Sequence, residues 1–359
     1  MPLSDLPKET LLDIADHLDD AGLNTLSRSN KQVYDLLNRF LYYRDLTKSQ
    51  GRSLLWGVKN GVESTVQRAL AAGRHLNPIP KCYYIALEHA ADHGCTHLVK
   101  LLLEIDGINP NLVSPEWESF PLILAAEGGH STVVELLLAT VNVDPNVKDL
   151  WKSASALHCA CKKGNVSIVK QLLARGDIDV NSRDQQSFSP LHWAVVPGVA
   201  SNADVIKLLL DREDIDVNQQ HQSGRTALAE AASYNSIEAA KLLLGRHDVK
   251  QNLPDNNGWT PLFWACNQKE CLPMVDLLLE NDGVDPNARD NNGRTPLAHA
   301  CLLGYVDIAH SLLSHPDTNP NAVDSNGVSI LAHVKDRITP QYGGEIESLL
   351  RESRDAGAR

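Results

Sequence analysis

His158, Cys159 and Cys161 place side chains that could bind a metal ion or act as a nucleophile in one short stretch of the sequence. The two cysteines are two residues apart, so on a helix they point to different faces and cannot hold the same ion. No pattern typical of a Ser–His–Asp triad, a P-loop or a GxGxxG nucleotide site occurs in the chain. We therefore expect no catalytic residue, no metal, no cofactor and no enzyme activity.

The elements that must position these residues are repeats. One leucine position recurs at intervals of 33 to 37 residues, at Leu54, Leu87, Leu122, Leu157, Leu191, Leu228, Leu262, Leu297 and Leu331. A second marker is an asparagine eight residues after the last leucine of a leucine-rich run, at Asn111, Asn146, Asn181, Asn218, Asn252, Asn287 and Asn321. Two markers that stay in phase predict a stack of similar units.

Each unit has the pattern of two helices and a turn. Thr-Pro, as at residues 260–261, predicts a helix start, because threonine caps free backbone N–H groups and proline suits the first helical position. Small residues such as Ala126 let the second helix approach closely. The same position is filled elsewhere by Cys161, Cys266 and Cys301, so we expect these cysteines to fill packing space. Asn-Gly, as at residues 257–258, predicts a tight projecting turn.

The segment SPLHWA at Ser189–Ala194 resembles the TPLHxA signature of the ankyrin repeat. The resemblance covers roughly residues 51–350 and implies an all-α ankyrin-repeat solenoid, built from helix–turn–helix units with projecting β-turn or hairpin fingers. It implies about eight or nine units at residues 53–350, the last of them acting as caps, and a frayed tail at residues 351–359. It also implies structural hydrogen bonds for His158 and His192, which occupy the signature histidine position.

Residues 1–46 do not repeat. They predict about three short amphipathic helices, too small a segment to be stable alone. This segment resembles an F-box, with matching positions at Leu6, Pro7, Glu9, Leu11, Leu12, Ile14, Leu18, Leu23, Leu26, Asn30 and Lys31. Ser29 and the closing pair Leu41-Tyr42 depart from the F-box pattern. The resemblance implies docking on the Skp-type linker subunit of a cullin–RING ubiquitin ligase. The alternative is a helical cap over the first repeat, and residues 47–52 are expected to form a short linker.

Composition narrows the class of partner. The chain has a net charge of −12 and no run rich in lysine or arginine, which argues against nucleic acid or an anionic membrane as the main partner. No apolar stretch approaches the roughly 18 residues of a membrane span, and the acidic start lacks the pattern of a signal peptide. Seven cysteines without framework spacing favour a reducing compartment, the cytoplasm, the nucleus or both. We expect a monomer apart from its protein partners.

Large side chains at the turn tips predict a client-binding surface. The candidates lie at or beside projecting turns or at the end of a first helix: Trp117, Trp151, Phe188, Arg225, Tyr234, Trp259 and Arg294. Tryptophan and arginine are enriched in binding hot spots, and interleaved aromatic and cationic groups favour an acidic-aromatic or extended peptide. We expect Trp259 to face solvent, and Trp193 and Trp264 to lie in the core between helices. The alternative for the turn residues is that each ring packs over the neighbouring turn.

These patterns predict a substrate-receptor subunit of a ubiquitin ligase. The N-terminal segment would hold the ligase, and the concave ankyrin face would select a client protein for ubiquitin transfer. The alternative is an ankyrin scaffold or inhibitor that binds a protein partner with no ligase role. For the repeats we expect a single curved stack with neighbouring helices about 8–10 Å apart.

Overall fold

The structure is a computed structural model that describes Thr10, Ile14 and residues 31–73, 76–114, 116–196, 202–337 and 340–357. The chain forms two compact bodies. The N-terminal body comprises residues 1–156 and 174–178, and the C-terminal body comprises residues 157–173 and 179–359. The described residues form helices and turns without a strand, and their isolated antiparallel bridges are Lys148–Ser155 and Val323–Ser329. The prediction of an all-α fold is confirmed.

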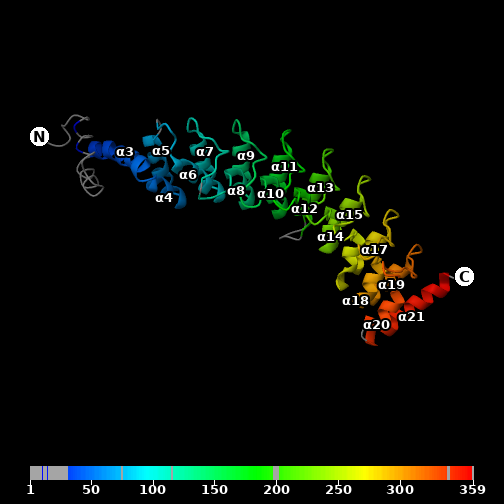
Figure 1. The fold of residues 1–359 in the computed structure, drawn as a ribbon. Coiled ribbons are helices and arrows are strands. Elements are labelled where there is room, and N and C mark those ends of the chain that lie inside the picture. The colour runs from blue at the N-terminus through cyan, green and yellow to red at the C-terminus, as the bar shows by residue number, and fades with distance from the viewer. Residues whose placement is uncertain are drawn as a thin grey trace. The chain divides into compact units, whose positions relative to one another are not determined.

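In the N-terminal body, the first helices of successive units pack against one another, and so do the second helices. Its helices are α3 (Lys31–Lys48), α4 (Arg52–Lys59), α5 (Glu63–Gly73), α6 (Lys81–Asp92), α7 (Thr96–Leu103), α8 (Pro121–Gly128) and α9 (Ser131–Ala139). The first helices α4, α6 and α8 pack in succession, and so do the second helices α5, α7 and α9. Figure 1 shows these two rows, with α3 at the start of the body against α5.

The C-terminal body repeats the same arrangement. Its helices are α10 (Ala156–Lys163), α11 (Val166–Leu173), α12 (Pro190–Val195), α13 (Ala203–Leu210), α14 (Ala227–Ser233), α15 (Ile237–Leu244), α16 (Pro261–Cys266), η2 (Lys269–Cys271), α17 (Leu272–Leu279), α18 (Pro296–Leu303), α19 (Val306–Ser314), α20 (Ile330–Arg337) and α21 (Pro340–Gly357). First helices α12, α14, α16, α18 and α20 pack in succession, and second helices α11 to α21 form a parallel row (Figure 1). The repeat unit predicted from the sequence is therefore a helix pair.

Hydroxyl caps of the predicted kind begin the first helices α12, α14 and α18. The Ser189 hydroxyl accepts a hydrogen bond from the backbone N–H of His192, whose ring accepts one from the backbone N–H of Ser189, so the two residues form a reciprocal cap. The hydroxyls of Thr226 and Thr295 each accept a hydrogen bond from the backbone N–H three residues later. Thr260 differs, because its buried hydroxyl has no partner among the described residues although Pro261 begins α16.

The repeated leucines form the core of the units. From Leu54 to Leu297 every member of the series is buried, and only Leu331, in the last unit, is half-buried. Each sits on a first helix between its neighbours in the row. Burial of a leucine side chain stabilises by about 1.5–3 kcal/mol, so the series supplies much of the energy that holds the stack together.

The repeated asparagines tie each loop to the loop of the following unit. Asn252, for example, donates from its side-chain nitrogen to the carbonyl oxygen of Gly283 at 2.7 Å and accepts from the backbone N–H of Asp285 at 2.8 Å. Equivalent pairs of bonds are made by Asn111, Asn181, Asn218 and Asn287. The second marker in the sequence is thus a ladder of bonds between units.

An arginine reinforces three of these joints. Arg246 pairs with Asp248 through two nitrogens and donates a third hydrogen bond to the carbonyl oxygen of Leu210, at the end of the preceding second helix. Arg175 and Arg212 repeat this geometry with Asp177 and Leu138, and with Asp214 and Leu173. We call these three arginines the arginine clamps.

The projecting turns are held together by backbone hydrogen bonds from one turn to the next. Asn291 donates its backbone N–H to the carbonyl oxygen of Asn257, and Ser325 donates to that of Asn292. Gly258 shows why these turns need glycine: its φ is +80°, and a Cβ there would lie 2.8 Å from the backbone nitrogen of Asn291.

Several predicted boundaries fall inside helices. α3 extends to Lys48, beyond the boundary expected at residue 46, and α21 extends to Gly357, beyond the end expected at residue 350. Of the F-box-like positions, Leu6, Pro7, Glu9, Leu11, Leu12, Leu18, Leu23, Leu26 and Asn30 lie outside the described residues. Lys31 begins α3. Among the described residues, no helix combines the length and apolar character that crossing a membrane requires.

Candidate functional site

The turns and first helices of the C-terminal body form one continuous candidate surface, which we call the turn–helix face. It comprises residues 157–163, 183–196, 218–234, 252–267, 287–303 and 321–334. The turns and first helices carry all the predicted client-binding residues of this body.

An aspartate in the turn orients an aromatic ring on the following helix. The indole nitrogen of Trp193 donates to Asp184 at 3.0 Å, and that of Trp264 donates to Asp255 at 3.2 Å. The other carboxylate oxygen of Asp255 accepts two backbone N–H groups of its own turn, from Asn257 and Trp259. Because one carboxylate both closes the turn and holds the ring, turn and helix are fixed together.

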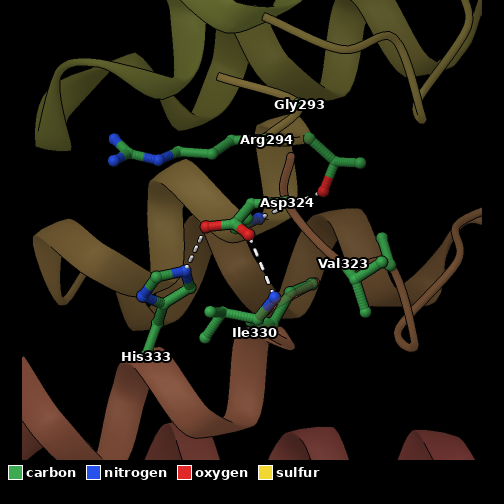
Figure 2. Close-up of a pocket in the computed structure, with 10 residues that line it drawn as sticks. Gly293, Arg294, Val323, Asp324, Ile330 and His333 are labelled. Atoms are coloured by element: carbon green, nitrogen blue, oxygen red, sulfur yellow. Dashed lines mark hydrogen bonds and ion pairs between the residues drawn. The ribbon is translucent and has the colours of Figure 1, made fainter. Parts of the chain in front are cut away.

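The last described turn uses histidine in the same way. His333 and Asp324 approach to 2.8 Å, and the second oxygen of Asp324 accepts the backbone N–H of Val328. Backbone hydrogen bonds and the His333 contact hold the pKa of Asp324 below its ordinary value. Figure 2 shows this arrangement, with Arg294 extended along the same small pocket.

One unit exchanges the two partners. His221 stands in the turn where the other units have aspartate, and Glu230 stands on α14 where they have an aromatic ring; the two side chains meet at 2.7 Å, each 1% exposed. The guanidinium of Arg225 adds an ion pair to Glu230 at 3.2 Å. Phe188 from the preceding unit stacks on the His221 ring, with centroids 4.2 Å apart.

Cations cover two of the oriented rings. The ammonium of Lys162 lies 5.0 Å from the centroid of the Trp193 ring, and the guanidinium carbon of Arg225 lies 4.5 Å from that of Trp264. Such contacts stabilise by about 0.5–2 kcal/mol and leave the remaining sides of the cation available to a ligand. The face therefore presents cation–aromatic pairs in a fixed geometry.

The buried cysteines and histidines of the first helices are structural. Burial raises the pKa of the Cys301 thiol to about 12, and it also raises the pKa values of Cys161 and Cys266, so these thiols stay protonated and unreactive. His158 and His192 each bond the backbone carbonyl of the next turn, at Phe188 and Arg225. Among the described residues, no group of three His, Cys, Asp or Glu side chains could hold a metal ion.

Comparison with known proteins identifies the family. A family model described as "Ankyrin repeats (3 copies)" matches residues 54–149, 122–221, 198–290 and 251–324. The chain belongs to the ankyrin repeat family. A search of curated proteins gave no match.

Two solved ankyrin repeat structures are similar to this chain. The ankyrin repeat domain of Bcl-3, described as a unique member of the IkappaB protein family, is 27% identical, with a TM-score of 0.52 over 59% of this chain and 91% of that chain. The ankyrin repeat protein EF0377 is also 27% identical, with a TM-score of 0.50 over 54% of this chain and 96% of that chain. Ankyrin repeats are protein-interaction modules, so the turn–helix face is a candidate protein-binding surface.

The ankyrin turns place the predicted client-binding residues in different environments. In the N-terminal body, Trp151 is 72% exposed at a turn tip, whereas Trp117 is half-buried with its ring 5.3 Å from that of His89. In the C-terminal body Tyr234 is 46% exposed at the end of α14, and Phe188, Arg225 and Arg294 are half-buried. The turn–helix face brings together Phe188, Arg225, Tyr234, Trp259 and Arg294.

Two expectations about rings need correction. The ring of Trp259 is half-buried rather than solvent-facing, because it packs against Phe263, Trp264 and His299 with centroids 4.9–5.8 Å away. Trp193 and Trp264 are half-buried rather than core residues, because the turn aspartates draw their indole nitrogens toward the face. In both cases a residue of the neighbouring ankyrin unit covers part of the ring: His299 for Trp259, Lys162 for Trp193 and Arg225 for Trp264.

The sequence analysis did not single out Lys162 or the turn aspartates. A signal was present, since Asp184 and Trp193, Asp255 and Trp264, and Asp324 and His333 are each nine residues apart. The exchanged pair His221 and Glu230 has the same spacing. Aligning the ankyrin units by this interval marks the two positions in each unit, and it also includes Asp290 and His299, where the ring bonds Asn267 instead.

Proposed function

We propose that this ankyrin repeat protein is an adaptor that binds a client protein on its turn–helix face and delivers it to a cullin–RING ubiquitin ligase through residues 1–46. The observation that carries the first part is the turn–helix face itself, whose turns and first helices carry oriented tryptophans, half-buried arginines and an exposed tyrosine. Aromatic and arginine side chains of this kind are typical of binding hot spots.

The second part rests on the sequence of residues 1–46. Leu6, Pro7, Leu11 and Ile14 follow the F-box pattern, and an apolar stripe on so short a segment needs a partner to cover it. The partner proposed is the Skp-type linker subunit. The site of action is proposed to be the cytoplasm or the nucleus, where the seven cysteines would stay reduced.

The mechanism needs positioning alone. Holding a client beside the ubiquitin-charged enzyme raises its effective concentration there to about the millimolar range, without any catalytic group in this chain. The competing proposal is a scaffold or inhibitor that uses the same face without a ligase. The turn–helix face supports both proposals equally, so the N-terminal segment decides between them.

The deciding experiment is a binding assay between the full chain and purified linker–cullin complex. The double variant Leu6→Ala with Pro7→Ala is expected to lose binding, while the double variant Leu150→Ala with Trp151→Ala, which changes an exposed turn tip, is expected to keep it. Circular dichroism of both variants should match that of the parent. Equal binding by both variants, or no binding by the parent, would exclude the ligase role and favour the scaffold.

A further inference from the structure

The exposed acids of the C-terminal body lie outside the turn–helix face. On the turn–helix face the exposed charged side chains are cationic: Lys162, Lys163, Arg183 and Arg289. On the second helices and the loops that follow them, exposed acids are frequent, among them Asp204, Glu213, Glu238, Asp276, Glu280 and Asp307. A chain of net charge −12 thus keeps one face free of exposed negative charge.

The acids that do occur on the turn–helix face are already engaged. All five are buried or half-buried: Asp184, Glu230, Asp255, Asp290 and Asp324. The four aspartates accept backbone N–H groups of their own turns, and Glu230 pairs with His221 and Arg225. A ligand approaching this face therefore meets cations whose charge no exposed carboxylate of the face offsets.

The cation–aromatic pairs recur in every second unit. Lys162 at the end of α10 lies over Trp193 of α12, and Arg225 before α14 lies over Trp264 of α16. The next cation in this series is Arg294, before α18, which shares a pocket with His333 of α20. Neighbouring helices in a stack are about 8–10 Å apart, so successive cations of the series are about 16–20 Å apart.

Arg294 has a donor that the fold does not use. Its Nε is buried and has no hydrogen-bond partner among the described residues. Figure 2 shows the side chain extended along the pocket that Asp324 and His333 also line, with the guanidinium at one end of it. A buried N–H without an acceptor is destabilising, and a carboxylate bound at the guanidinium would give this side chain an acceptor.

We propose that the turn–helix face binds an extended, acidic segment of the client protein, whose carboxylates contact Lys162, Arg225 and Arg294. An extended chain rises about 3.3 Å per residue, so side chains about five or six residues apart would match successive cations. Arg225 can take part because a guanidinium has five N–H donors, of which Nε pairs with Glu230 and one on a terminal nitrogen bonds the Ser233 hydroxyl. This inference deepens the proposed client-binding function and rests on it.

The test selects ligands from random peptides of about 16 residues, displayed on phage, with the full chain as bait; that length covers both intervals. Acidic peptides with carboxylates five or six residues apart are expected to be enriched. The tightest of them should bind roughly fivefold more weakly to Arg294→Gln and to Lys162→Gln, and binding should weaken as salt rises. Lys241→Gln, an exposed cation on α15, is the matched control and should bind as the parent does.

Several outcomes would overturn the inference. Selected peptides without acidic enrichment would do so, as would equal losses for Lys241→Gln and Arg294→Gln. Tighter binding of single-stranded DNA or phosphatidylserine vesicles than of any selected peptide would show a general anion surface instead. Unfolding midpoints of the three variants, measured alongside, distinguish lost binding from lost structure. If non-acidic peptides are selected and bind this face, the client-binding function stands and the acidic ligand class is wrong.

Discussion

His221 and Glu230 meet at 2.7 Å with the acidic and the ring-bearing partner exchanged relative to Asp184 and Trp193 one unit earlier. After the exchange the acidic side chain lies on the helix and the ring lies in the turn. The pair still joins the turn to its helix. Because both side chains are 1% exposed, neither can replace its lost partner with water. The two positions are therefore expected to tolerate a joint exchange better than either single change.

That expectation can be tested with three variants. Glu230→Ala should lower the free energy of unfolding by about 3–5 kcal/mol, since it removes one partner of a buried charged group, and His221→Ala should also be destabilising. The double variant His221→Asp with Glu230→His recreates the order of Asp324 and His333, and it should recover at least half of the loss. Urea denaturation followed by circular dichroism measures the three. A double variant no more stable than Glu230→Ala would show that the positions do not act as a pair.

The corrected position of Trp259 changes what its removal should do. Trp259→Ala takes away contacts with three aromatic rings, so it should lower the free energy of unfolding by about 2–3 kcal/mol as well as weaken client binding. Trp151→Ala is the matched control, because its ring is 72% exposed and should change stability by less than about 0.5 kcal/mol. Thermal melts of both variants provide the comparison. Equal melting temperatures would mean that the Trp259 ring contributes nothing to packing.

The asparagine ladder gives a graded prediction at a single joint. Asn252→Ala removes two hydrogen bonds between loops and should destabilise by about 1–3 kcal/mol. Asn252→Asp keeps the acceptor for the backbone N–H of Asp285 but sets a carboxylate oxygen against the carbonyl oxygen of Gly283, so its stability loss should be at least as large. Hydrogen exchange of the Asp285 amide reports the bond directly. Faster exchange in Asn252→Asp than in Asn252→Ala would contradict the assignment of the two bonds.

Stability should fall in mild acid because of His192. Burial, together with the nearby His221, Arg183 and His158, lowers the pKa of His192 to about 3, and the hydrogen bond to the Arg225 carbonyl acts in the opposite direction. His192 takes up a proton near pH 6.5 in the unfolded chain but not in the folded chain. The free energy of unfolding is therefore at its full value above pH 6.5 and falls between pH 6.5 and 3. The free energy of unfolding is expected to be about 2 kcal/mol lower at pH 5 than at neutral pH.

The matched variant for this prediction is His192→Phe, since Phe263 fills the equivalent position of another unit. The variant loses the hydrogen bonds of His192 to Ser189 and to the Arg225 carbonyl, so it should be less stable than the parent at pH 7. Its deficit should shrink by about 2 kcal/mol between pH 7 and pH 5, because it has no proton to take up there. Urea titrations at both values measure the deficit. A constant deficit would assign the acid sensitivity to other groups.

The sequence predicted the features that repeat. Leu262 and Leu297 are one repeat apart and occupy the same buried position between helices. A residue type that recurs at this interval therefore predicts the core of each unit. Asn252 and Asn287 kept their register for the same reason, although their role as a ladder between loops appeared only in the structure. Helix starts at Pro261 and Pro296 followed from local chemistry, which the rest of the chain does not alter.

The features that depend on contacts between units could not be predicted in this way. His299 of the next unit covers part of the Trp259 ring, and Arg225 of the preceding unit covers part of the Trp264 ring. The sequence of one turn does not predict a contact with a residue of another unit. The exchanged pair of His221 and Glu230 was hidden because each residue departs from the pattern of its own position, and only their common spacing connects them.

The arginine clamps have a mechanical consequence. At the joints after Arg246 the clamp position is filled by Asn281 and His315, and Asn281 bonds Leu277 of its own helix rather than a carbonyl of the preceding unit. Within the C-terminal body, the units that follow Asn281 should therefore separate under tension before the units joined by Arg212 and Arg246. Stretching this body should accordingly release its last units while the clamped joints still hold.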